Sequence, residues 1–397
     1  MLTAHRIALD PNDVQATYLS KACGVARFAY NWALSEWQKQ YDEHKKNPEQ
    51  PAPTEAALRR LLNSIKRDQF PWMLEVTKNA PQMAIIQLGK AFVNFFAGRA
   101  KYPKFRKKGI HDRFTLTNDQ FKIDASHIQI PNLGKVRMRE ALRFTGKILS
   151  ATLSRIADRW FVSIAIETPD PAKQIAYPKT VGVDVGLSTM ATLSTGDKIR
   201  GPKPHKALLQ RLKQFSKALS RKVKGSKNRA KAKTKLARLH ARISNIRLDA
   251  THKFTTMLVK QFGTICIEDL NVRKMVKNRR LARSIVDMGF HEISRQLEYK
   301  IAKNGGTLVK ADRFFASSKI CSDCGYRLPT LELSVREWTC PHCHVVHDRD
   351  VNAARNLEKY AASSAVKACG GSSSGRMDVP FGETAPMKQE VNINIYL

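Results

Sequence analysis

Two Cys-x-x-Cys pairs constrain the fold of this chain more than any other feature. The first pair is Cys321 and Cys324, and after fifteen residues the second pair is Cys340 and Cys343. Pairs at this spacing are typical of a zinc ribbon, in which each pair forms a tight turn and the four thiolates complete a tetrahedral site. We therefore expect one structural Zn²⁺, which folds a segment too small for a core of its own.

Three histidines lie in or beside the second pair: His342, His344 and His347. Because four thiolates already satisfy a zinc ion, we expect these histidines at the surface or in contact with nucleic acid; the alternative is that one of them substitutes for a cysteine as a zinc ligand. The other three cysteines are scattered, so the chain has no regular disulfide framework and fits a reducing compartment.

The charge of the chain indicates its partner. It carries 69 Lys and Arg against 34 Asp and Glu, a formal net charge of +35 over 397 residues. An excess of this size favours a polyanion, and nucleic acid is the obvious one. No stretch approaches the roughly 18 apolar residues of a membrane span, and the first residues lack the apolar core of a signal peptide. We expect a cytoplasmic, nucleoid-associated protein of a prokaryote with no membrane partner.

Three carboxylates occur on separate elements of the second half. Asp184 lies among valines in VGVDVG, Glu268 ends the strand GTICIEDL, and Asp350 begins an alanine-rich helix. Alone, each has an ordinary interpretation: a turn carboxylate, a strand-end charge shared with Asp269, and a helix N-cap at Asp348 or Asp350. Together, hard oxygen ligands favour Mg²⁺ or Mn²⁺, and two such ions about 3.5 to 4 Å apart hydrolyse phosphodiesters.

The hydrophobic pattern divides the chain into two halves. In the first half, a strand at LTAHRIAL leads into helical spacing to about residue 96, and strand-like runs over 110–168 predict a β meander or barrel. The second half opens with three short strands. Residues 201–250 then carry sixteen Lys and Arg against one Asp, on two amphipathic helices around KVKGSKNRA. Two more strands, GTICIEDL and GTLVKADRF, flank a helix, so we expect a multidomain α/β protein.

The order of these motifs resembles the RuvC-like nuclease core of the transposon-encoded TnpB proteins, RNA-guided DNA endonucleases related to type V CRISPR effectors. The shared motifs are VGVDVGLSTMATLS, TICIEDL, CSDCG with CPHC, and HDRDVNAARN. KAFVNFF, YPKFRKK, KAKTKLARLHARI and RQLEYKIAKNGG extend the resemblance to about residues 1–360. It implies an N-terminal wedge β-barrel with an inserted helical recognition domain, then an RNase H-like RuvC domain with an inserted zinc ribbon.

The resemblance also implies domain boundaries. They are a wedge β-barrel at 1–175 with a helical insertion at about 12–100, a RuvC-like domain with a basic helical hairpin at 176–316, the ribbon at 317–347, the last RuvC element at 348–362, and a disordered tail at 363–397.

In this family the first Asp, the strand-end Glu and the second Asp of Asp-Arg-Asp bind the catalytic ions. The resemblance therefore assigns Asp184, Glu268 and Asp350 to Mg²⁺ or Mn²⁺, and gives Asp348 a supporting role at the start of the helix. Since none of the three carboxylates is replaced, we expect an active endonuclease that cuts DNA beside a short flanking motif by two-metal hydrolysis.

The resemblance further implies a guide RNA from the right end of the transposon and a double-stranded DNA target, both held through their phosphates. A merely solvated surface remains the alternative for the basic helices. Tyr102 and Phe105, interleaved with six basic residues, are candidates for base stacking or for packing on the neighbouring helix. Lys78, Asn79 and Gln82 are candidates for recognising the flanking motif, or for an ordinary helix start.

Two rival functions remain open. One is a miniature type V CRISPR effector, which only a neighbouring repeat array distinguishes. The other is an RNA-guided repressor without cleavage, against which the intact carboxylates argue. A strand-joining transposase would need a nucleophilic Tyr beside paired histidines, and the sequence contains no such group. One monomer per RNA is favoured.

Overall fold

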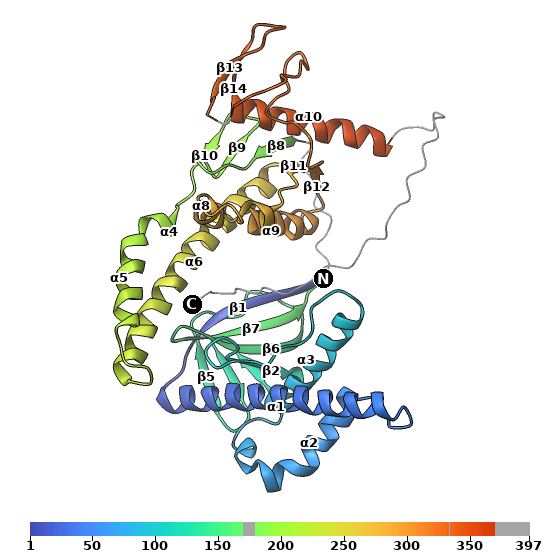
Figure 1. Cartoon of the computed structure of the whole chain (residues 1–397), viewed down its shortest axis with the longest axis vertical. Coiled ribbons are helices and arrows are strands. Elements are labelled where there is room, and N and C mark those ends of the chain that lie inside the picture. The colour runs from blue at the N-terminus through green and yellow to red at the C-terminus, as the bar shows by residue number, and fades with distance from the viewer. Residues whose placement is uncertain (170–178, 333, 370–397) are drawn as a thin grey trace.

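The computed structural model describes residues 1–169, 179–332 and 334–369. It has two α/β units, one around a seven-stranded sheet and one around a five-stranded sheet, and a small two-stranded ribbon beside the second (Figure 1). The predicted boundary at 175/176 lies outside the described residues. None of the described helices has the length and apolar character that a membrane span requires.

The first unit is built on β1 (Leu2–Asp10), which pairs antiparallel with β7 (Arg159–Glu167) and with β5 (Gly134–Met138). The strand order is β2-β6-β7-β1-β5-β4-β3. The remaining strands are β2 (Arg113–Thr117), β3 (Lys122–Asp124), β4 (His127–Ile130) and β6 (Lys147–Ile156). Among the described residues no pairing joins the edge strands β2 and β3, so the closed barrel that the sequence predicted is not confirmed.

All but one of the described helices of this unit lie between β1 and β2 in the chain: α1 (Asp13–Lys46), α2 (Glu55–Gln69), the 3₁₀ helix η1 (Pro71–Glu75) and α3 (Asn79–Phe96). The 3₁₀ helix η2 (Asn118–Gln120) follows β2. α1 starts at a capping box: Asn12 Oδ1 accepts the Gln15 N–H at 2.9 Å, and Gln15 Oε1 accepts the Asn12 N–H at 3.1 Å. Its buried face packs with α3 and the sheet in one apolar core.

The second unit has the strand order β10-β9-β8-β11-β12. Its strands are β8 (Thr180–Asp184), β9 (Ala191–Leu193), β10 (Lys198–Ile199), β11 (Thr264–Glu268) and β12 (Thr307–Ala311). β8, β11 and β12 run parallel, whereas β9 and β10 form an antiparallel extension. The three short strands that the sequence predicted at the start of this half are therefore confirmed.

Helices cover both faces of the five-stranded sheet (Figure 1). α6 (Lys227–Gln261) and α9 (Phe290–Lys303) pack on one face, against Val181, Val183, Ile265 and Ile267. Alternate strand residues point to opposite faces, so Gly182 and Cys266 face α10 (Arg349–Cys369) on the other side, where Cys266 packs with Leu357. α10 continues past residue 362, so the predicted last element was too short; the rest of the predicted tail, 370–397, lies outside the described residues.

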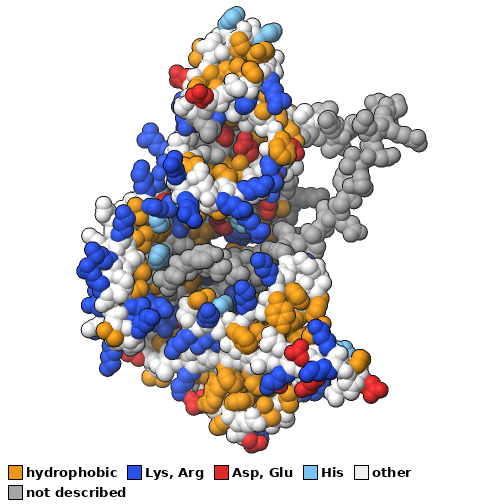
Figure 2. All heavy atoms as spheres, viewed as in Figure 1, with side chains coloured by type: hydrophobic (Ala, Val, Ile, Leu, Met, Phe, Trp, Pro, Cys, Tyr) orange, Lys and Arg blue, Asp and Glu red, His pale blue; other side chains and the backbone are white. Residues whose placement is uncertain are grey.

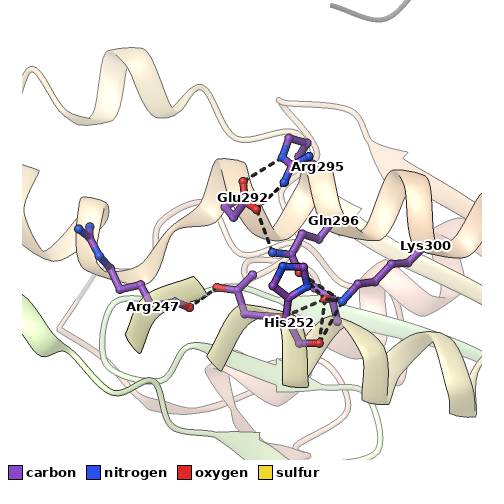
Figure 3. Close-up of polar contacts among 8 residues, drawn as sticks. Arg247, His252, Glu292, Arg295, Gln296 and Lys300 are labelled. Carbon is purple, nitrogen blue, oxygen red and sulfur yellow. Dashed lines mark hydrogen bonds and ion pairs between the residues drawn. The ribbon is translucent and has the colours of Figure 1, made fainter. Parts of the chain in front are cut away.

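A buried polar network holds α9 on α6 (Figure 3). Lys300 Nζ donates to Thr255 Oγ1 at 2.6 Å and to the His252 carbonyl at 3.0 Å. Gln296 accepts from Thr255 and donates to Glu292, each at 2.8 Å. Burial lowers the pKa of Lys300 to about 8. Because β12 follows α9 directly, this network also sets where β12 joins the sheet.

The basic region forms a helical hairpin beside the sheet. After the short α4 (Pro204–Ala207), α5 (Leu209–Ser220) packs on the first half of α6 through Leu212, Leu236, Leu239 and Ile243. This confirms the two predicted amphipathic helices. Arg238 on α6 pairs with Asp158 in the β6–β7 turn at 2.5 Å, so the hairpin touches the first unit. The remaining short helices are α7 (Val272–Met275) and α8 (Ala282–Met288).

Gly182 is required for the close approach of α10 to β8. A Cβ there would lie 1.9 Å from the Ala354 carbonyl oxygen and 2.5 Å from the Glu358 backbone nitrogen. We expect Gly182→Ala to lower the free energy of unfolding by about 3 kcal/mol, because backbone cannot move aside as a side chain can. Gly24→Ala in α1 is the control, since its nearest neighbour is 3.9 Å away; it should stabilise by about 0.5 kcal/mol. If chemical denaturation gave the same change in the free energy of unfolding for Gly182→Ala and Gly24→Ala, the close contact of α10 with β8 would not be what requires the glycine.

Candidate functional site

Asp184 and Glu268 lie at the same edge of the five-stranded sheet. β8 and β11 are parallel, and their register ends with Val183 opposite Ile267, so the next residues along the two strands are Asp184 and Glu268. By the same alternation that directs Gly182 and Cys266, both carboxylates point to the side that α10 covers. The carboxyl ends of parallel strands are the usual place for a binding site in such sheets.

Asp350 reaches this edge because of how α10 begins. The ribbon strand β14 (Val346–Asp348) leads directly into the helix. Asp348 Oδ1 accepts the backbone N–H groups of Asp350 at 3.1 Å and Val351 at 3.0 Å, and Lys198 donates to its other oxygen at 2.5 Å. Asp348 is thus the N-cap. Burial alone would raise the pKa of Asp348. The hydrogen bonds from Lys198 and from the backbone of Val351 and Asp350 together have the larger effect and lower this pKa.

The three carboxylates interact electrostatically. Burial, followed by the charges of Glu268 and Asp350, raises the pKa of Asp184 to about 8, against a smaller opposite effect of Arg349 and Arg336. A carboxyl group with so high a pKa holds its proton near neutral pH, because burial and two nearby negative charges both disfavour its ionised form. A divalent cation would remove this repulsion and favour the ionised form.

The surroundings of the trio are polar. Thr192 lies opposite Asp184 in the β8–β9 ladder, and its buried hydroxyl has no hydrogen-bond partner among the described residues. Glu268 Oε1 accepts a 2.5 Å hydrogen bond from Ser317, and Asp350 lies 3.6 Å from Arg336. Within the described ranges, ligand atoms of the three carboxylates do not all lie within 4.8 Å of one another.

The four ribbon cysteines form one cluster, with their sulfur atoms all within 4.8 Å of one another. The Sγ atoms of Cys321 and Cys343 are 3.6 Å apart, and those of Cys324 and Cys340 are also 3.6 Å apart. Tetrahedral zinc with Zn–S bonds of about 2.3 Å places its sulfur ligands about 3.8 Å apart. The donor set and its spacing therefore fit one zinc ion.

Backbone hydrogen bonds shape both cysteine turns in the same way. The Gly325 N–H donates to the Cys321 carbonyl at 3.0 Å, and the His344 N–H donates to the Cys340 carbonyl at 2.9 Å. Gly325 and His344 both have positive φ, at 79° and 58°. β13 (Glu337–Thr339) pairs with β14, which joins the second turn to the start of α10.

The position of His347 corrects the sequence prediction. Its side chain is 3% exposed, with Nε2 3.0 Å from Cys321 Sγ and its ring 4.7 Å from that of Trp338. His347 lies opposite Trp338 in the β13–β14 pair, so both point into the small ribbon core. His342 and His344 are both exposed as expected, and the ring of His342 stacks with that of Tyr326.

The three candidates for DNA recognition differ in how far the structure exposes their side chains. Asn79 is 2% exposed and donates to Thr117 Oγ1 at 2.7 Å, so the prediction that it faces a DNA base was wrong. Lys78 is exposed and Gln82 is half-buried. Lys78 lines two adjoining pockets of about 320 and 200 Å³, and Gln82 lines the smaller.

Residues of α2 complete the smaller pocket, namely Arg59, Asn63 and Lys66. Nothing in the sequence distinguished these side chains from the other polar residues of a surface helix. Only the packing of α2 beside the start of α3 brings them next to Lys78 and Gln82.

The two aromatic candidates also differ. The ring of Tyr102 meets those of Phe92 and Phe95 edge-on, at 5.6 and 5.2 Å between centroids. This favours the packing alternative for Tyr102. Phe105 is 50% exposed and remains available for stacking.

Three family models match the chain. Residues 163–279 match OrfB_IS605, described as a probable transposase, and residues 290–357 match a Cas12f1-like TNB domain. Residues 1–46 match a helix-turn-helix domain, although here they form β1 and the single helix α1.

Curated relatives cover nearly the whole chain. A Streptomyces pristinaespiralis protein, designated an RNA-guided DNA endonuclease, is 41% identical over 372 residues, covering 91% of this chain and 89% of the relative. The chain belongs to the OrfB family of TnpB-like proteins. The Escherichia coli K12 relative InsQ, with the same designation, is 32% identical over 386 residues, covering 93% of this chain and 94% of InsQ.

A solved structure shows that the fold is shared. A Cas12f1–sgRNA–target DNA complex superposes with a TM-score of 0.56 at 15% identity, covering 88% of this TnpB-like chain and 83% of that chain. The mixed α/β architecture expected from the sequence is thereby confirmed.

We expect the double variant Cys321→Ser, Cys324→Ser of this TnpB-like protein to lose its zinc and its DNA cleavage, because the ribbon then lacks two ligands and the start of α10 is no longer fixed. The measurement is zinc per chain by plasma mass spectrometry. Cys23→Ala is the control, because this cysteine lies outside the cluster and burial raises the pKa of its thiol to about 12. The Cys23→Ala protein should keep one zinc per chain. Full zinc content and activity in the double variant would refute the ribbon assignment.

The pKa of Asp184 predicts a pH-dependent stability in buffer without divalent ions. The folded-state pKa of about 8 exceeds the usual value of about 4, so the folded chain binds more protons between these pH values. The wild-type protein should therefore lose stability as pH rises from 4 to 8. The Asp184→Asn variant should lose less stability over this pH range. At pH 8 it should be more stable than the wild type by roughly 1 to 3 kcal/mol. If the thermal unfolding curves of the wild type and of Asp184→Asn shifted equally between pH 4 and pH 8, the raised pKa would not belong to Asp184.

Proposed function

We propose that this protein is an RNA-guided, Mg²⁺-dependent DNA endonuclease with a RuvC-like site. The observation that carries the proposal is the convergence of Asp184, Glu268 and Asp350, with the pKa of Asp184 raised by burial and by the charges of the other two. A carboxylate with a perturbed pKa beside other carboxylates is characteristic of a catalytic metal site. The designations of the curated relatives support RNA guidance and DNA as the substrate.

The topology of the second unit supports an RNase H-like fold. Numbered along the chain, its strands lie in the order 3-2-1-4-5, with the second antiparallel to the first. We assign this unit to the RuvC-like domain, its ribbon to the zinc module, and the first unit to the wedge and recognition parts. The proposed boundaries are those inferred from the sequence, except that the last RuvC element continues through α10.

In this proposal Asp184, Glu268 and Asp350 would hold two Mg²⁺ or Mn²⁺ ions, which would supply an activated water molecule and charge stabilisation at the leaving oxygen. Asp184 would serve as a ligand in its ionised form. Asp348 and Lys198 hold the first turn of α10, so Asp350 keeps its place at the strand ends. Ser317 orients Glu268, and the four cysteines hold one zinc.

Exposed Lys and Arg side chains of the hairpin provide a surface for the guide RNA and the guide–target duplex. Figure 2 shows blue side chains gathered over this part of the molecule. They include Arg211, Lys213, Lys217, Arg221, Lys222, Lys224, Lys227, Lys231, Lys233 and Lys235. Acidic residues are scarce on the hairpin, which argues against a merely solvated surface. Such binding is strong, salt-dependent and independent of sequence, while base pairing supplies specificity.

We assign recognition of the flanking DNA motif to the smaller pocket, which lies between α2 and α3. Arg59, Lys66 and Lys78 supply positive charge there, while Asn63 and Gln82 carry amides that suit adenine edges. Lys78 and Gln82 remain candidates from the sequence, and the α2 residues join them.

The deciding experiment co-expresses the chain with its flanking DNA, sequences the RNA that co-purifies, and presents the complex with a target library. One defined RNA and Mg²⁺-dependent cuts that Asp184→Ala abolishes are expected. Gln82→Ala should change the flanking motif and leave the rate on the best target intact.

Binding to the library without cuts would favour the RNA-guided repressor. The absence of a defined RNA would overturn RNA guidance altogether. A repeat-derived RNA would identify the complex as a CRISPR effector.

A further inference from the structure

A buried hydroxyl holds one of the three carboxylates. Ser317 lies after β12 in the segment that leads to the first cysteine pair, and its side chain is buried. Its Oγ donates to Glu268 Oε1 at 2.5 Å. A fixed donor on one carboxylate oxygen limits rotation of the group and leaves the second oxygen free for another ligand.

The Ser317 segment is in turn held by α10. Asn356 is buried, and its amide donates to the carbonyls of Ser317 at 2.7 Å and Ile320 at 2.6 Å. Asn352, 1% exposed, donates to the Ile320 carbonyl at 2.7 Å and accepts the Ser322 N–H at 2.8 Å. Together the two amides satisfy three backbone groups of residues 317–322.

The spacing of the two asparagines explains how one helix does this. Residues four apart lie on the same face of a helix, so Asn352 and Asn356 both face residues 317–322. The same helix carries Asp350 in its first turn. Residues 317–322 also include Cys321, which belongs to the cluster that fits zinc. One set of buried hydrogen bonds therefore links the zinc site, Asp350 and Glu268.

We propose that Asn352 and Asn356 are positioning residues, which hold Ser317 so that Glu268 is oriented for metal binding relative to Asp350. This inference rests on the proposed function, because it concerns the metal site of the nuclease. It predicts that the zinc cluster supports both carboxylates: Asp350 through β14 and the N-cap, and Glu268 through residues 317–322.

If the amides of Asn352 and Asn356 only filled space, replacing them would have a different effect from the one proposed. An unpaired buried polar group is costly, so the two asparagines contribute to stability in any case. A purely structural role would change stability without a selective effect on the carboxylate site. The distinguishing quantity is the affinity of the folded, zinc-bound protein for divalent ions.

The test measures Mn²⁺ binding to the full-length protein–RNA complex by electron paramagnetic resonance, without DNA, together with zinc per chain. Asp184→Ala defines the signal of the carboxylate site. Ser317→Ala and Asn356→Leu should each weaken Mn²⁺ binding about tenfold while one zinc per chain is retained. Ser317→Thr keeps the hydroxyl and should restore most of the affinity. The control is Asn304→Leu, which removes an amide donor to the Val259 carbonyl on the other side of the sheet.

Each result has a defined meaning. Unchanged Mn²⁺ affinity in Ser317→Ala would overturn the positioning role and leave the proposed nuclease intact. Equal losses in Ser317→Ala and Ser317→Thr would also overturn it, because the hydroxyl would not be the cause. If Asn356→Leu fails to fold, the two Ser317 variants decide. A wild-type complex without Mn²⁺ binding that depends on Asp184 would overturn the nuclease proposal and this inference together.

Discussion

The contact between helix α10 and strand β8 is the constraint on which the rest of the second unit depends. Only a glycine at position 182 lets the helix approach the strand so closely, since any Cβ would meet the backbone at Ala354. That approach covers one face of the sheet and brings the first turn of the helix to the ends of β8 and β11. The same helix carries Asp350 and the amides that bind residues 317–322. Fold, ribbon and carboxylate site therefore share one packing contact.

The sequence predicted those parts of the structure that depend on local spacing. The short strands around Asp184, the helices of the basic hairpin and the four cysteines were all visible as patterns. The grouping of Asp184, Glu268 and Asp350 was inferred from their chemistry and from the family resemblance, whereas strand register is a tertiary property that the sequence does not give. The raised pKa of Asp184 also needed coordinates.

Other features had no usable signal in the sequence. Asn79 looked available for DNA, yet the packing of α3 beside β2 buries it against Thr117. His347 was expected at the surface, although its alternation with Trp338 across a short hairpin directs it inward. The strand-like runs over 110–168 predicted a β meander or barrel, but the sequence had no means of deciding whether the edge strands β2 and β3 pair. In each case strand pairing or packing against another element decided the outcome.

The basic hairpin has a consequence for the lifetime of the protein. Its two helices share a small apolar core centred on Leu212, Leu236, Leu239 and Ile243, while lysines and arginines of like charge crowd its outer surface. This arm is therefore held together weakly until a polyanion neutralises it, and a bound RNA stabilises the folded form by mass action. Chains made in excess of their RNA would be degraded first, so the cellular level of the protein would follow the supply of its RNA.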